Sequence, residues 1–437
     1  MRARPYYVQT LCALLGACAF VPAVAALDLE QAYQAALAND ATFASVRSAY
    51  TATLEKLPQA RASLLPAISL AGNRAEASTT RLPGVTYTNE SYTLQLIQPL
   101  FRWSGWQTYE QSKLQLAVGE AQLAQGRQDL ILRVAQAYFD VLAAQDNLAF
   151  IGAQKAAISE QLESAKRNFE IGTATITDTY EAQARYDLAQ AQEIQAESDL
   201  AVRIGALQQI IGTPAGDLAK LPPAVNVPAP VPARVDAWTE QAAANNLAVA
   251  QATLNSEIAQ RGIEIAKSGH YPSVDLAANV ARTRGLVGQT VVNDFYTTRS
   301  VGVQVSVPIF AGFGTTSRVD EAVALSEKAR NDLEVARRAA IQNTRVAFQG
   351  VNAGLAQVRA LEAAQVSSRS ALDANKTGYE VGVRINIDVL NAQQQLYSTE
   401  RDLAKARYDA LLSGLRLKAA SGILSEDDVR QVNALLR

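Results

Sequence analysis

The stretches Phe169–Asp199 (FEIGTATITDTYEAQARYDLAQAQEIQAESD) and Tyr379–Asp409 (YEVGVRINIDVLNAQQQLYSTERDLAKARYD) align without a gap when the first is shifted by 210 residues. Gly172 then matches Gly382, and an aspartate matches six residues after each glycine. In both stretches a helix-favouring run ends at the glycine, and a second run starts after a turn of five or six residues. Glycine is the residue that most often ends a helix. The sequence therefore predicts two helical hairpins, one in each of two tandem repeats.

The first repeat is expected over 26–215, with its hairpin tip near 172–178. Apolar residues at helical spacing predict a helix from Leu27 to about Lys56, with Asp28 as its N-cap. Alternating apolar and polar residues then predict two strands within 66–101. A run without proline from about Gly105 to the tip predicts one helix of roughly 100 Å.

The second repeat is expected over 237–437 and has the same order of elements. Its two strands fall within 272–310, where valine alternates with small or polar residues from Val301 onward. Its hairpin tip is expected near 382–388. Between the repeats, 216–236 holds five closely spaced prolines, which predicts an extended linker.

Residues 1–25 resemble a secretory signal peptide, with two arginines at the start and an apolar run over 11–20. Ala23–Ala25 is a small-x-small cleavage site. Leu15–Cys18 also fits a lipoprotein signal, so lipidation of Cys18 remains an alternative. The apolar run is short for a membrane span, which needs about 20 residues.

The composition excludes several classes of function. The formal net charge is −2, which gives no reason to expect nucleic-acid binding. The chain has one histidine, His270, and both cysteines lie in its first twenty residues. These counts give no basis for a metal site, a cofactor or a histidine-based catalytic set, so we do not expect an enzyme.

Four strands per chain cannot close a barrel, because bacterial membrane barrels need about eight strands or more. An open sheet in lipid would leave backbone groups without hydrogen bonds. The chain is therefore expected to be an α+β membrane protein whose copies share one barrel, continued by the long helices as a cylinder. Cyclic symmetry allows two, three or four copies, giving eight, twelve or sixteen strands.

The repeat order and the two tip motifs resemble the TolC family of outer-membrane exit ducts. The motifs that carry this resemblance are Ile171–Asp178 with Glu181–Asp187, and Tyr379–Arg384 with Asp388–Leu390. It covers essentially the whole chain after the signal. The resemblance implies a homotrimer with a twelve-stranded β-barrel in the lipid of a Gram-negative outer membrane. A helical coiled-coil barrel would extend into the periplasm.

The resemblance also implies a function and partners. The trimer would join a periplasmic adaptor protein and an inner-membrane pump, either an ABC transporter or a proton-driven pump. Secreted polypeptides (type I secretion), small toxic compounds, or both would pass through it. The tip motifs are nearer to the secretion branch than to the lipid-anchored efflux branch. The alternative is a trimeric coiled-coil adhesin or structural envelope protein with a barrel anchor, but strands in the middle of both repeats argue against it.

By the same resemblance the duct narrows at the helical tips. The candidate gate residues are Thr177 and Asp178 in the first tip and Tyr379, Arg384 and Asp388 in the second. Polar links between wet side chains are individually weak, about 0–1 kcal/mol, which suits a gate that must open. The alternative is that Asp178 and Asp388 cap the returning helices, where the helix dipole favours an acid.

Two further expectations concern the tips. Gly172 and Gly382 are candidate docking points for the adaptor, and simple helix C-capping is the alternative. Three copies of Asp388 around an axis would form a cation-attracting ring. The family often has a second acid three residues later, where this chain has Asn391, so we expect weaker block by multivalent cations.

Overall fold

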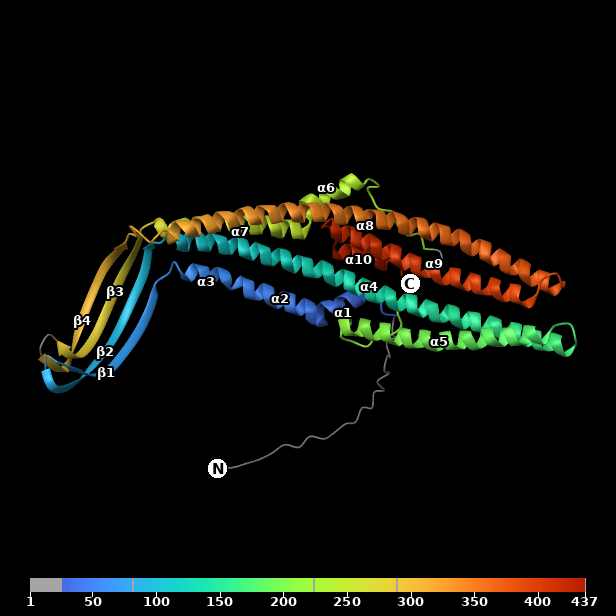
Figure 1. Cartoon of the computed structure of the whole chain (residues 1–437), viewed down its shortest axis with the longest axis horizontal. Helices are drawn as coiled ribbons and strands as arrows, with labels where there is room; N and C mark the ends of the chain where they lie inside the picture. The colour runs from blue at the N-terminus through green and yellow to red at the C-terminus, as the bar shows by residue number, and fades with distance from the viewer. Residues whose placement is uncertain (1–25, 81, 223–224, 288–289, 437) are drawn as a thin grey trace, which may run out of the picture.

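The computed structural model describes residues 26–80, 82–222, 225–287 and 290–436. The expected signal peptide, 1–25, lies outside the described residues. Figure 1 shows an elongated chain with a β-sheet at one end, long helices running to the other end, and shorter helices around the middle. We call these three parts the sheet, the hairpin tips and the waist.

The sheet contains four antiparallel strands in the order β1-β2-β3-β4. They span Ala67–Thr79, Leu82–Phe101, Ser273–Val287 and Thr290–Ser306. β2 pairs with β3 even though the whole first hairpin lies between them in the sequence. The outer edges of β1 and β4 have no strand beside them in the described chain. The sheet is therefore open at both sides.

The strand register assigns each residue to one face, because directly paired residues point the same way. One face carries an apolar band: Ile68, Leu70, Leu94, Leu96, Val274, Leu276, Val280, Val301, Val303 and Val305. The opposite face carries small polar residues, including Ser69, Thr93, Gln95, Asn279, Ser300 and Gln304. An apolar outer face and a polar inner face are the pattern of a membrane barrel wall.

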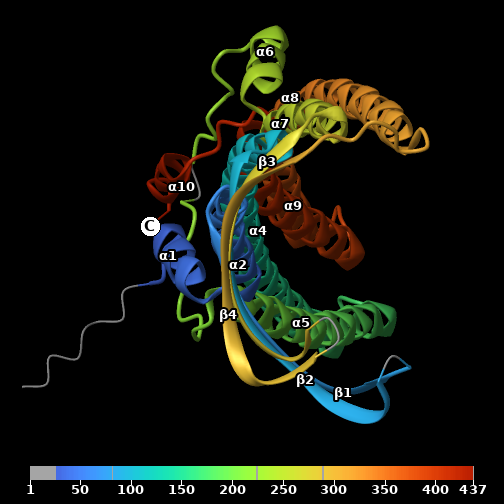
Figure 2. The same cartoon turned by 90° about the vertical axis from the view of Figure 1, so that its left-hand side faces the viewer.

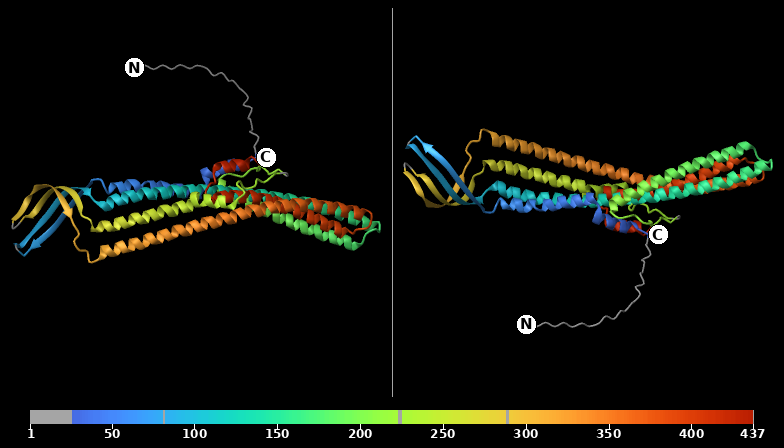
Figure 3. Two further views of the ribbon diagram at one scale, coloured as in Figure 1. Left: turned by 90° about the horizontal axis from the view of Figure 1, so that it is seen from above. Right: turned by 90° about the horizontal axis from the view of Figure 1, so that it is seen from below.

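Four long helices connect the sheet to the hairpin tips. These are α4 (Trp103–Glu170), α5 (Ile176–Ile211), α8 (Gly314–Glu380) and α9 (Asn386–Ala420). α4 has 68 residues and α8 has 67, so each is about 100 Å long. The single long helix expected before the first tip is therefore present. Both tips lie at the same end of the molecule, side by side (Figure 3).

Shorter helices fill the length between the waist and the sheet, where no return helix reaches. They are α2 (Ala41–Leu54), α3 (Lys56–Ala62) and α7 (Leu247–Lys267), which is followed by the short 3-10 turn η1 (Ser268–His270); α1 (Leu29–Asn39) precedes α2 at the waist. Asp28 caps α1 as expected. The single helix expected up to about Lys56 is wrong: it is broken at Asp40 and Glu55. Asp40 leaves the helical conformation because its side chain caps α2 through the amide of Phe43.

The waist holds α6 (Val235–Asn245) and α10 (Glu426–Asn433) in addition to α1. α6 begins within the last two residues of the expected linker, and α10 was not expected from the sequence. The buried core here joins both repeats and both chain ends: Leu29, Tyr33, Leu130, Tyr138, Leu142, Leu207, Ile211, Leu411, Leu415 and Val429. The waist is therefore the place where the two repeats are fixed to each other.

Seen from the sheet end, the chain forms an open arc (Figure 2). α1, α6 and α10 lie on the outer side of this arc, and the sheet curves in the same sense as the long helices. We assign the apolar band to the outer side of the curve, because the lipid-facing side of a membrane barrel is apolar and its interior is polar. Of the helices described, none combines the length and apolar character needed to cross a membrane.

Candidate gate at the helical tips

The two tips have the same backbone geometry. Gly172 and Gly382 both have φ of +76°, a left-handed conformation that glycine adopts without strain. In the first tip the amides of Thr173 and Ala174 donate to the carbonyl of Asn168, at 2.8 and 3.1 Å. The amides of the corresponding residues of the second tip donate in the same way to Gly378. The repeated glycine therefore produces a repeated turn, and C-capping is one role of both glycines.

Asp178 forms a capping box at the start of α5. Its carboxylate accepts from the Thr175 amide at 3.0 Å, and the Asp178 amide donates to the Thr175 hydroxyl at 3.3 Å. The Thr175 hydroxyl also donates to the carboxylate at 2.7 Å. Within one chain, Asp178 is thus engaged as a cap and contacts neither Tyr379 nor Arg384.

Arg384 and Asp388 lie together in the second tip. The guanidinium Nη1 is 3.6 Å from a carboxylate oxygen of Asp388, one helical turn further along the chain. Arg384 remains more than half exposed, and Asp388 is about one third exposed. This ion pair is therefore wet and weak, about 0–1 kcal/mol.

Tyr379 forms a link between the two hairpins. Its hydroxyl oxygen accepts a hydrogen bond of 3.1 Å from the side-chain amide of Asn168, which lies at the end of α4. Thr177 is exposed, and its side chain makes no hydrogen bond to another described residue. The structure thus brings together Arg384 and Asp388, links Tyr379 to the first hairpin, and leaves Thr177 facing solvent.

Sequence reasoning missed Asn386, the buried polar residue at the start of α9. Only 2% of Asn386 is exposed. Its Oδ1 accepts from Gln161 Nε2 of α4 at 2.5 Å, and its Nδ2 donates to the carbonyl of Asp178 at 3.4 Å. The 210-residue repeat contained a signal for it, because the matching position of the first tip is Ile176. The polar Asn386 in place of the apolar Ile176 indicates a contact that the second repeat makes and the first does not.

A second polar link joins α5 to α9. Arg185 donates from Nη1 to Gln394 Oε1 at 2.6 Å and from Nη2 to Asn391 Oδ1 at 3.0 Å. Asn391 is the residue that replaces the family's frequent second acid. The uncharged side chain of Asn391 therefore still has a role here, because its carbonyl oxygen accepts a hydrogen bond from Arg185 of the other hairpin.

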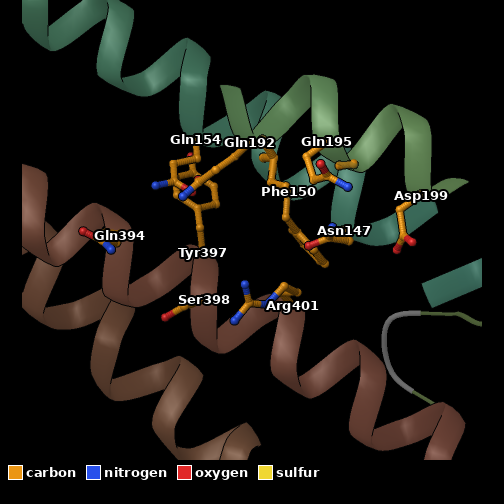
Figure 4. A pocket seen from close by; sticks show the side chains of 12 residues that line it. Asn147, Phe150, Gln154, Gln192, Gln195, Asp199, Gln394, Tyr397, Ser398 and Arg401 are labelled. Carbon is orange, nitrogen blue, oxygen red and sulfur yellow. The ribbon is translucent and has the colours of Figure 1, made fainter. Parts of the chain in front are cut away.

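A polar pocket of about 550 Å³ separates the two hairpins on the waist side of these links. Figure 4 shows Gln154 and Asn147 of α4 and Gln192 and Asp199 of α5 facing Gln394, Tyr397, Ser398 and Arg401 of α9. Burial, followed by the neighbouring charge of Glu400, raises the pKa of Tyr397. The two hairpins therefore meet through separable hydrogen bonds and a wet space, with only small apolar clusters near the tips.

The fold places the chain among the helical-barrel channels of the outer membrane. It is similar to the Campylobacter jejuni CmeC outer membrane channel, with a TM-score of 0.78, 17% identity and coverage of 93% of this chain and 89% of that one. It is equally similar to CusC, with a TM-score of 0.78, 16% identity and coverage of 91% and 92%. At these identities the likeness concerns the fold alone.

Sequence comparison defines the family. The outer membrane efflux protein model matches residues 32–213 and 238–423. The outer membrane protein TolC of Vibrio cholerae is 36% identical, with 95% of each chain covered. The alkaline protease secretion protein AprF of Pseudomonas aeruginosa is 33% identical, with 94% of this chain and 87% of that protein covered. The chain belongs to the outer membrane efflux protein family, and the resemblance to the TolC family is confirmed. It is an outer-membrane protein.

Proposed function

We propose that three copies of this chain form the exit duct of a tripartite export machine, a passive conduit with no chemistry of its own. The observation that carries this proposal is the four-stranded sheet, whose β1 and β4 edges are both unpaired. Three arcs joined edge to edge supply twelve strands, which is within the size range of membrane barrels. The long helices continue the wall for about 100 Å, and family membership argues against the adhesin alternative.

The proposed partners are a periplasmic adaptor protein and an inner-membrane pump, which is an ABC transporter or a proton-driven pump. Support comes from what the relatives are called. One is named an alkaline protease secretion protein and another a proteases secretion protein. Others are named efflux proteins. We infer that secreted polypeptides, small toxic compounds, or both pass through the duct from the pump to the outside.

The gate is proposed at the tips, where Thr177, Asp178, Tyr379, Arg384 and Asp388 lie. Within one chain the first two residues do not contact Arg384 or the Tyr379 hydroxyl. Within one chain, Asp178 reaches the second tip through its backbone carbonyl, which accepts from Asn386. Side-chain links from Thr177 or Asp178 to Tyr379 or Arg384 are therefore proposed to run between neighbouring chains. Arg384 is exposed and only weakly paired, which leaves it available for such a link.

Asp388 is proposed to form an acidic ring in the trimer. We expect Asp388→Ala to weaken block by a trivalent cation such as hexamminecobalt, because three carboxylates are removed from the constriction. The measurement is conductance of the purified channel in a planar bilayer. Asp320→Ala, which removes an exposed acid near the sheet end of α8, is the control. Equal block before and after the Asp388 change would refute the ring.

Gly172 and Gly382 are proposed as adaptor docking points in addition to capping. A Cβ added at either glycine would meet no heavy atom within 4 Å, so the space in front of both turns is open. Two similar turns per chain would give six in a trimer, available to the hairpin ends of an adaptor.

Deletion of the gene, with and without complementation, tests the function. We expect the deletion strain to lose a secreted protein or to become sensitive to antibiotics and detergents. The intact gene should restore the phenotype. Normal secretion together with normal resistance in the deletion strain would contradict the proposal.

A further inference from the structure

Beyond the apolar band, the outer face of the sheet carries a cluster of arginines. The register puts Arg74, Arg282, Arg284 and Arg299 on the same face as the band, within three successive rows of paired residues. Rows on one face are about 7 Å apart along a strand. Glu90 shares a row with Arg74 and Arg284. Glu76, one row further out, is the second carboxylate on this face, so four positive charges face two negative ones.

Only one of the four arginines has an acidic partner. Arg284 Nε donates to Glu90 Oε2 at 2.9 Å, and the Tyr92 hydroxyl donates to Glu90 Oε1 at 2.7 Å. Both oxygens of this carboxylate are thus engaged. Among the described residues, Arg74, Arg282 and Arg299 form no ion pair, whereas Arg284 does. Arg74 lies opposite Glu90 and feels its charge without forming a close ion pair, and the carboxylate is already engaged by Arg284 and Tyr92. The guanidinium groups of Arg74, Arg282 and Arg299 are therefore not held in an ion pair with a described residue.

An aromatic ring orients one of these free cations. The guanidinium carbons of Arg282 and Arg284 lie 4.8 and 4.9 Å from the ring centre of Phe295. Tyr92 packs against the same ring, with 6.2 Å between the ring centres. Cation–π contact holds a guanidinium without using its N–H donors. Arg282 therefore keeps its donors available for an external acceptor.

The position of the cluster along the strands defines its surroundings. Each strand leads from the helices through the apolar band to the rows of arginines, so the cluster lies at the end of the barrel away from the helices. In the proposed duct this end faces outward. An arginine on the lipid face is unfavourable at the membrane centre and tolerated near the interface. Phosphate, like carboxylate, is an anion that a guanidinium binds with two parallel hydrogen bonds.

We propose that Arg74, Arg282 and Arg299 bind the phosphate groups of a phosphorylated glycolipid in the outer leaflet. Arg74 lies on β1 and Arg299 on β4, three strands and two rows away, so their backbones are about 20 Å apart. One phosphate cannot reach both, but a sugar headgroup that carries two phosphates can. A zwitterionic phospholipid is a weaker candidate, because its own positively charged amine competes with the arginines for its phosphate. The proposal rests on the proposed function, because it requires the sheet to be the outer wall of a barrel.

Native mass spectrometry of the full-length channel in detergent tests the site, with a diglucosamine lipid bearing two phosphates as the probe. In the triple variant R74Q/R282Q/R299Q we expect apparent affinity to fall about tenfold or more, as for the loss of charge-assisted hydrogen bonds. The matched control R318Q/R337Q/R345Q removes three exposed arginines of α8 and should bind like the original protein. The lysine variant R74K/R282K/R299K should retain part of the affinity, since the charge remains.

Three results would overturn the proposal. These are equal binding by the triple glutamine variant, an equal loss in the α8 control, and equal binding of the same lipid without its phosphates. Displacement of the lipid by millimolar inorganic phosphate would also overturn it, since any anion would then suffice. Conductance in a planar bilayer separates the two proposals. A variant that forms pores but binds lipid normally refutes the lipid site alone, whereas an original protein that forms no pores refutes the duct.

Discussion

At the tips, the left-handed backbone conformation of each turn depends on a glycine. Gly172 and Gly382 adopt φ of +76°, where a side chain costs about 1–2 kcal/mol. The open space around them means that this cost comes from the backbone and not from crowding. The backbone alone therefore favours glycine at both turns, whether or not an adaptor binds them.

Gly172→Ala is expected to loosen the first tip. Strain of about 1 kcal/mol should speed local opening roughly fivefold, measured as amide hydrogen exchange over 168–178. Gly205→Ala is the matched control, because Gly205 lies inside α5 with a Cβ position that meets nothing within 4 Å. That control should leave exchange at the tip unchanged. Unaltered exchange in Gly172→Ala would show that the turn tolerates a side chain.

The tip residues differ in how far the sequence could predict them. The glycines and the cap at Asp178 follow local rules, because their partners are within about six residues. The Asn386 contact with Gln161 joins residues 225 positions apart, and no local rule contains that pairing. The repeat could show that position 386 was unusual, but only the packing of α9 against α4 shows why.

Among the elements, the two hairpins are held together near the tips mainly by polar side chains. Asn386, Arg185 and Tyr379 each bond to the other hairpin. Each such bond contributes about 1 kcal/mol. The hairpins can therefore separate without exposing a large apolar surface, which is what a gate between α5 and α9 requires.

Asn386→Ala is expected to raise the leak of the closed channel. The change removes the acceptor of Gln161 and the donor to the Asp178 carbonyl, so the separated state is favoured by about 1 kcal/mol. Conductance of the reconstituted channel at low voltage measures it. The control is Asn375→Ala, because the side chain of Asn375 bonds only within its own helix, to Ala371. An unchanged leak would mean that these bonds do not hold the gate.

Near the waist, α4 and α9 are joined through a half-buried acid. Asp146 accepts a hydrogen bond of 2.7 Å from the hydroxyl of Tyr408. Burial raises the pKa of Asp146, and this bond opposes the rise only in part. Because the folded-state pKa is above the unfolded one, the folded state binds the proton more tightly. The contribution of this group to stability is therefore full at low pH and is lost as pH rises through the folded pKa.

Asp146→Asn should consequently stabilise the protein at pH 7. The amide has no charge to bury and still offers an oxygen to Tyr408. We expect the difference in unfolding free energy from the original protein to shrink as pH falls toward 4. Denaturant unfolding across this pH range measures it, with Asp373→Asn, an exposed position on α8, as the control. A destabilised variant at pH 7 would contradict the assignment.

For the whole molecule, the open sheet demands association. We expect light scattering of the detergent-solubilised protein to give three chains per particle, because twelve strands close a barrel and four cannot. A stable monomer with a closed sheet would refute the duct. A dimer or tetramer would refute the trimer while keeping a shared barrel.

The overall shape was only partly predictable from sequence. Alternation and helix length predict strands, long helices and two repeats, because these patterns reflect local geometry. The waist could not be predicted in the same way. α10 is short, and its core contacts reach Leu29 and Tyr33 at the other end of the chain. The break at Asp40 was also missed, since a capping residue between two helical runs resembles a continuing helix. The break at Glu55 involves no side-chain cap, so no capping signal marks it.

The uninterrupted α4 makes the waist a fulcrum. From Leu142, the last large side chain of α4 that is fully buried in the waist, the helix runs about 42 Å to its end at Glu170. A tilt of about 5° at that fulcrum would carry the far end sideways by roughly 4 Å, the reach of a rigid lever of that length. A small rotation about the waist, too slight to disturb the core that joins the two repeats, would therefore move the hairpin tips far enough apart to open the duct.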